Sequence, residues 1–149
     1  MGQIMTACSV LRHGMEFRAE SGTGHVVPMD ASVPDGGDDA GFRPMELLLV
    51  GLAGCTGMDV ISILRKMRQE ITGYEVWVQG TRAEAHPMVF TEIAVEHRIT
   101  GRNIDPAAVA RAIELSESRY CGAGAMLGKV AQLTHTYRVV ASEEQPVAL

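Results

Sequence analysis

The chain has 149 residues, 46% of them hydrophobic and 21% charged, and its formal net charge at pH 7 is -5. This composition predicts one globular domain over residues 1–149 with a buried core, and it excludes extensive disorder. The 13 lysines and arginines are scattered, so a nucleic-acid-binding surface is not expected. A small-molecule enzyme or a binding protein fits such an acidic chain better.

The N-terminal residues lack the charged stretch followed by an apolar stretch that a secretory signal requires, so we expect a cytoplasmic protein. In that reducing compartment the three cysteines fit free, catalytic or redox-active thiols better than structural disulfides. One of them, Cys8, lies in a strand-like stretch, where we expect a buried or half-buried small residue.

Three segments of strand length, separated by Gly-bearing turns, begin the chain and predict a β-meander over 5–12, 15–20 and 25–30. The segment 31–41 is rich in Gly and Asp and predicts an exposed loop.

A long helix is predicted from Met45 to about Glu70, with Pro44 at its first turn. Its first half is apolar on all sides, so we expect protein to surround it, whereas 65–70 is expected to be a solvated helical tail. Three glycines leave a bare stripe that predicts close approach of another helix or strand. They are Gly51, Gly54 and Gly57.

The apolar run 47–64 is long enough to span a bilayer. However, it contains Asp59, and a charge inside a membrane costs about 2.5 to 3.5 kcal/mol on insertion scales. We therefore expect a central helix buried in protein.

Two strands are predicted over 74–83 and 89–100, and the second alternates with a period of two, so one of its faces is expected to be buried. Asp105 and Pro106 then supply the N-cap and first turn of a helix over 107–120. Cys121 falls at its end, where Gly122 is expected to stop the helix.

A short helix over 123–129, a strand over 133–140 and a frayed tail after Ser142 complete the chain. The predicted order is βββ-α-ββ-αα-β, an α+β fold. Its long helix is too apolar for so few strands to cover, so a homodimer is expected.

Cys55 and Cys121 are the most informative pair of residues, because each lies in an apolar segment of small residues. Their separation of 66 positions excludes a CxxC redox motif and any compact zinc-knuckle spacing. If the two thiols cooperate, the fold must bring them together.

The histidines give no sign of a metal site, because their spacing is not that of metal ligands. No metal or cofactor is therefore expected. His97 and His135 fall on the faces of predicted strands and are expected to be packed or hydrogen-bonded.

Several motifs occur in an order that resembles the OsmC/Ohr family of cysteine-dependent organic hydroperoxide reductases. The segment Arg43-Pro-Met-Glu-Leu-Leu-Leu-Val-Gly-Leu-Ala-Gly-Cys55 is followed by Asp59-Val and then by Arg119-Tyr-Cys121. The likeness covers about 20–140 and points to the OsmC-like (YhfA-type) branch. It implies an OsmC-like fold and an intertwined homodimer around two long central helices, with active sites at the subunit interface.

The resemblance also implies the chemistry of a peroxiredoxin-like enzyme. Cys55 would attack an organic hydroperoxide or hydrogen peroxide, and its sulfenic acid would condense with Cys121. A dithiol or a thioredoxin-like or lipoyl reductant would regenerate the thiols. In the family an arginine held by a glutamate stabilises the thiolate; here Arg43 or Arg18 would be the arginine and Glu46 the glutamate.

One departure from the family pattern supports an alternative function. The catalytic glutamate of the family follows the proline directly, where this chain has Met45, and Glu46 lies one place later. A one-residue shift rotates a helical side chain by about 100°. The alternative is a non-catalytic OsmC-like protein that binds a small apolar ligand or senses oxidation. Glu46 would then complement the helix dipole, and Asp59 would cap a helix or pair with an arginine.

Overall fold

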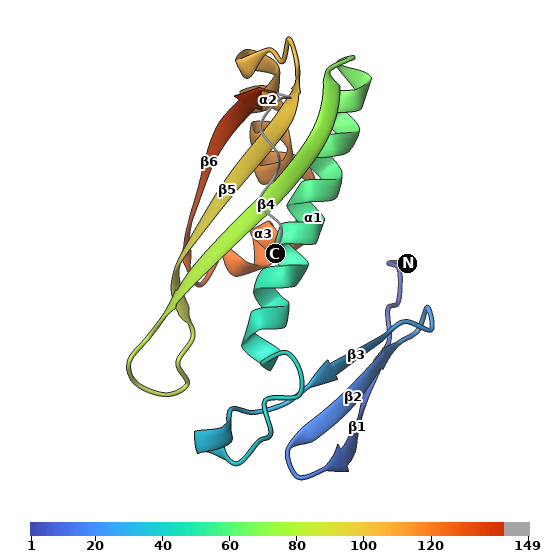
Figure 1. The fold of residues 1–149 in the computed structure, drawn as a ribbon, viewed down its shortest axis with the longest axis vertical. Coiled ribbons are helices and arrows are strands. Elements are labelled where there is room, and N and C mark those ends of the chain that lie inside the picture. The colour runs from blue at the N-terminus through green and yellow to red at the C-terminus, as the bar shows by residue number, and fades with distance from the viewer. Residues whose placement is uncertain (142–149) are drawn as a thin grey trace. The chain divides into compact units, whose positions relative to one another are not determined.

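The computed structural model describes residues 1–141 and has the predicted α+β order of elements (Figure 1). The frayed tail expected after Ser142 lies outside the described residues. The chain divides into two compact units between Leu48 and Leu49. A single domain over 1–149 stays a prediction.

The first unit contains a three-stranded antiparallel meander of β1 (Ala7–His13), β2 (Glu16–Ser21) and β3 (Val26–Met29). None of the residues in these strands is buried. Cys8 is exposed, so its predicted burial is wrong for the single chain: β1 has no covering layer within its unit.

The loop after β3 is organised by a buried carboxylate. Asp30, which is only 3% exposed, accepts hydrogen bonds from the backbone N–H groups of Ala31, Asp38 and Ala40 at 2.8 to 3.1 Å. Burial by itself would raise the pKa of Asp30, but these donors and the charge of Arg43 hold it below its usual value. The loop therefore has a fixed shape, and it includes the short 3₁₀ helix η1 (Val33–Asp35).

The long helix α1 (Pro44–Lys66) is shorter at its end than predicted. Arg65 and Lys66 form the exposed last turn of α1, as expected, but Arg68 has a positive φ of 60° and β4 already begins at Glu70, so the expected helical tail is wrong beyond Lys66. By length and mean hydropathy α1 could cross a membrane, and only 22% of its apolar window is buried within the chain. The covering expected on all sides is thus absent from the described part of a single chain.

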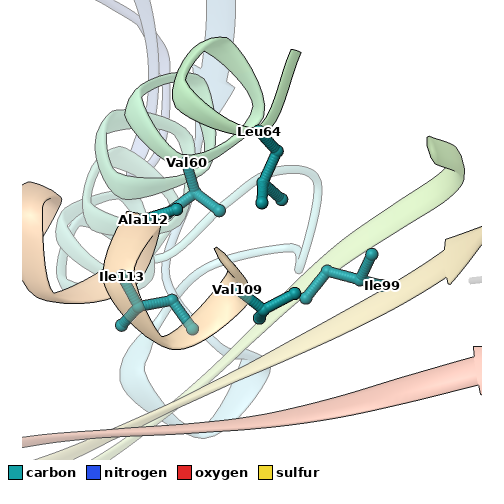
Figure 2. Close-up of a cluster of buried hydrophobic side chains, with 6 residues drawn as sticks. All are labelled: Val60, Leu64, Ile99, Val109, Ala112 and Ile113. Atoms are coloured by element: carbon teal, nitrogen blue, oxygen red, sulfur yellow. The ribbon is translucent and has the colours of Figure 1, made fainter. Parts of the chain in front are cut away.

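The second unit contains a sheet of order β4-β5-β6, made of β4 (Glu70–Arg82), β5 (Phe90–Arg102) and β6 (Gln132–Ala141). β4 and β5 form an antiparallel hairpin, whereas β6 returns parallel to β5. α1 and α2 (Pro106–Leu115) pack on one face of this sheet (Figures 1 and 2). Asp105 is the predicted N-cap of α2, because its carboxylate accepts the N–H of Ala107 at 2.9 Å.

A cluster of apolar side chains from α1, β5 and α2 forms the core (Figure 2). Its members are Val60, Leu64, Ile99, Val109, Ala112 and Ile113. Of the three glycines of α1, Gly57 alone packs closely against another element. A Cβ on Gly57 would meet Val76 Cγ2 of β4 at 3.3 Å, whereas Gly51 and Gly54 face open space. Close approach of a strand is therefore confirmed at Gly57.

Candidate redox site

The fold brings Cys55 and Cys121 together. Cys55 is half-buried on α1, and Cys121 is only 4% exposed. Burial raises the pKa of Cys121 to about 11, against the opposing N–H of Gly124, and the neighbouring Cys55 and Asp59 raise it further. Cys121 is thus held as a neutral thiol beside a cysteine that solvent can reach.

A π turn explains how Cys121 becomes buried. The sequence predicts one helix over 107–120, but the α-helical part, α2, ends at Leu115 and is followed by the π turn η2 (Ser116–Tyr120). The N–H of Cys121 donates to the carbonyl of Ser116, five residues earlier, at 2.9 Å. In a continuous α-helix Tyr120 would occupy the buried face of Ser116. Instead Tyr120 is 55% exposed and Cys121 takes that face.

Cys121 also begins the next helix. It is the N-cap of α3 (Gly122–Leu127), and its Sγ accepts the N–H of Gly124 at 3.3 Å. The prediction that Gly122 stops a helix is wrong, because Gly122 is the first residue of α3. The extended backbone of Cys121 makes the break instead, with φ -77° and ψ 100°.

A buried polar network links α1 to the π turn. Ser116 Oγ lies 3.1 Å from Thr56 Oγ1 and donates to Asp59 Oδ2 at 3.0 Å. Thr56 and Ser116 are fully buried. Asp59, expected to cap a helix or pair with an arginine, accepts this hydroxyl instead, because it lies one turn after Cys55 beside the end of α2. The helical spacing of Val109, Ala112, Ile113 and Ser116 predicts that they share one face of a helix, but it gives no sign of this network.

A second polar chain crosses the sheet from β4 to β6. Tyr74 Oη lies 2.5 Å from His97 Nδ1, and His97 Nε2 lies 3.0 Å from His135 Nδ1. Burial, with repulsion from His135, lowers the pKa of His97 to about 4, and burial also lowers the pKa of His135. The expected packing of both histidines is confirmed. Tyr74 was missed, although pairing the period-two strands would have placed it near His97.

The three charged residues predicted to assist Cys55 lie in the first unit. The Arg43 guanidinium pairs with Asp39 and donates to the carbonyls of Asp30 and Gly41. Glu46 accepts the backbone N–H of Arg43 at 2.9 Å, a contact that caps the start of α1. Arg18 is exposed on β2. A role of any of them at Cys55 stays a prediction.

An open cleft of about 560 Å³ lies beside the polar network in the second unit. Its walls are mostly apolar and include Asp59 and Tyr120, which connect it to the network and to the π turn. The lining residues are Met58, Asp59, Ser62, Ile63, Lys66, Met67, Leu115 and Tyr120. Within residues 1–141 no group of three metal-ligating side chains is assembled.

The fold agrees with the comparison to known proteins, and the chain belongs to the OsmC-like protein family, whose model matches residues 36–136. It is 43% identical to Protein YhfA of Escherichia coli (strain K12) over 129 residues, which are 87% of this chain and 93% of that protein.

Solved structures show the same fold. A hypothetical protein from Aquifex aeolicus VF5 is 29% identical with a TM-score of 0.84, covering 95% of this chain and 100% of that one. The organic hydroperoxide resistance protein OsmC from Legionella pneumophila is 10% identical with a TM-score of 0.67, covering 91% of this chain and 96% of that one. The predicted family and fold class are confirmed.

Proposed function

We propose that this protein is a cytoplasmic, thiol-dependent peroxidase that reduces organic hydroperoxides through Cys55 and Cys121. The observation that carries the proposal is the placement of two unequal thiols side by side from positions 66 residues apart. The half-buried Cys55 can meet a substrate, whereas the buried Cys121 has Cys55 as a neighbour. Membership of a family that includes organic hydroperoxide resistance proteins supports the substrate class.

The proposed reaction has two steps that balance. The Cys55 thiolate attacks the O–O bond, its sulfur becomes a sulfenic acid, and the alkoxide leaves as the alcohol after taking a proton. The Cys121 thiol then condenses with the sulfenic acid to a disulfide, with loss of water. A dithiol or a thioredoxin-like or lipoyl reductant returns both cysteines to thiols.

Positive charge near Cys55 would favour its thiolate, and an arginine would supply it. Arg18 is the better of the two candidates, because Arg43 is engaged with Asp39 and two carbonyls. Within residues 1–141 Arg18 forms no ion pair. Glu46, if it acts, would hold the arginine while still capping α1.

The exposed apolar surface supports a homodimer. Leu48, Val50 and Met58 project from α1 with 46 to 73% exposure, and the meander leaves Phe17 and Val26 uncovered. Exposed apolar surface of this extent is typical of an interaction site, and a second copy can cover it.

One observation favours the second candidate, a non-catalytic binder of a small apolar ligand. Glu46 already has a structural role at the start of α1, and the 560 Å³ cleft offers apolar walls. Such a protein would bind ligand saturably and would not turn over peroxide.

Cysteine variants distinguish the two candidates. Cys55→Ser is expected to abolish peroxide turnover, and Cys121→Ser to allow at most one turnover with a thioredoxin-like reductant. Cys8→Ser, at an exposed cysteine, is the matched control and is expected to keep full activity. Multi-turnover activity in Cys55→Ser would contradict the assignment.

A further inference from the structure

Ser116 connects Cys121 to α1, because its backbone contacts Cys121 and its side chain contacts α1. The carbonyl of Ser116 accepts the N–H of Cys121 at 2.9 Å. Its hydroxyl reaches the other way, to Asp59 Oδ2 at 3.0 Å and to Thr56 Oγ1 at 3.1 Å. Thr56 directly follows Cys55 on α1, and Asp59 lies one turn after Cys55. Ser116 therefore connects the helix that carries Cys55 to the backbone of Cys121.

The direction of the hydrogen bonds is fixed by chemistry. Asp59 can only accept as a carboxylate, so the Ser116 hydroxyl donates to it, and the Thr56 hydroxyl donates to Ser116 in turn. Ser116 and Thr56 are fully buried, so no water competes for these groups. A buried hydroxyl that loses its partner cannot be resolvated without movement of the turn.

We propose that the Thr56–Ser116–Asp59 hydrogen-bond chain is the positioning device of Cys121, which locks the π turn against α1 so that the Cys121 sulfur stays within reach of Cys55. This rests on the proposed function, since it assigns residues that position the resolving thiol. It also gives the π turn a role. The one residue that a π turn adds to an α-turn places Cys121 on the same buried face as Ser116, and such turns are frequent at functional sites.

The test is the equilibrium between the Cys55–Cys121 dithiol and its disulfide in glutathione redox buffers, which measures the effective concentration of the two thiols without peroxide. Ser116→Ala is expected to lower this effective concentration by about tenfold or more, because a small displacement is costly for reacting groups. Thr56→Val, close in shape, removes only the distal donor and is expected to produce a smaller fall. Glu114→Gln, on the exposed face of α2, is the matched control and is expected to match wild type.

Asp59→Asn separates positioning from charge, because an amide oxygen still accepts from Ser116. Its effective concentration is expected to stay near wild type. The thiolate titration of Cys121, followed by ultraviolet absorbance in a Cys55→Ser background, is expected to shift to lower pH. The two proteins compared are Cys55→Ser and Cys55→Ser with Asp59→Asn. Cys121 is buried in both, and the charge at position 59 is the only difference among the side chains that raise its pKa. A general loss of packing would also lower this pKa, but it would lower the effective concentration as well, whereas removal of the charge alone leaves the effective concentration near wild type.

The outcomes are distinct. A folded Ser116→Ala or Thr56→Val with the wild-type effective concentration would overturn the proposal. If Ser116→Ala does not fold, Thr56→Val decides it. A wild-type protein that forms the disulfide in glutathione buffers but does not reduce peroxide would refute the proposed function and leave the positioning role intact.

Discussion

At the scale of single residues, the two thiols differ in what surrounds them. Cys121 is enclosed, caps α3 and has its pKa raised to about 11, so it stays a thiol at neutral pH. Cys55 is half-buried, and a reactant can approach it. An enzyme that must first meet a substrate and then close a disulfide needs this asymmetry, because a sulfenic acid formed at the accessible cysteine then finds its partner within the protein.

The buried imidazole of His97 predicts a specific dependence of stability on pH. Its pKa is lowered from 6.5 to about 4 by burial and by His135. Between these values the unfolded chain binds more protons than the folded protein, so the free energy of unfolding falls as the pH falls. Complete protonation of His97 would cost about 3 kcal/mol.

Urea unfolding measured from pH 7.5 to pH 4 checks this prediction. His97→Phe is expected to flatten the profile between about pH 6.5 and 4, whereas His25→Gln, at an exposed histidine, is expected to leave it unchanged. Equal slopes for wild type and His97→Phe would show that another group controls the acid sensitivity.

At the scale of elements, the π turn is the part of the site that depends most on local geometry. A helix carrying Val109, Ala112, Ile113 and Ser116 at helical spacing could be predicted from the sequence, and all four are buried. Periodicity does not reveal an extra residue in the following turn, because only packing against α1 selects it. The hydroxyl network was missed for the same reason: Thr56 and Ser116 are 60 positions apart.

Removing or adding one residue in this turn is expected to have opposite effects on the Cys55–Cys121 disulfide. Deletion of the exposed Ser118 makes Cys121 the fourth residue after Ser116, so an ordinary α-turn would keep it on the buried face. Insertion of one alanine after Ser118 would rotate it by about a further 100° toward solvent. We expect the deletion to retain the Cys55–Cys121 disulfide and the insertion to lose it, as read by mass spectrometry after diamide oxidation. Equal disulfide yields would show that the phase of the turn does not matter.

At the scale of the whole molecule, the sequence predicted the order of elements because each has its own local signal, such as Asp105-Pro106 at the start of α2. It also predicted that α1 needs more cover than one chain gives. The burial of Cys8 was predicted wrongly for the single chain, because a strand-like pattern does not show which layer covers it. The charged partners of Cys55 remain predictions, because no local pattern fixes which arginine faces a distant thiol.

The homodimer is tested by Val50→Asp. Val50 is 49% exposed on α1, and a carboxylate buried there in a subunit contact would be strongly unfavourable. We expect wild type to sediment with the mass of two chains and to melt at a temperature that rises with protein concentration. The variant is expected to sediment as a monomer, whereas Arg111→Gln on the exposed face of α2 should behave as wild type. A wild-type monomer at all concentrations would contradict the dimer.

The most direct measurement is turnover of an organic hydroperoxide by the wild-type protein with a dithiol reductant, with the thiols mapped by mass spectrometry after one equivalent of oxidant. The proposed function predicts rapid turnover and a disulfide between Cys55 and Cys121, with Cys8 still reduced. Absence of turnover, together with slow oxidation spread over all three cysteines, would contradict the peroxidase and direct attention to a ligand of the 560 Å³ cleft.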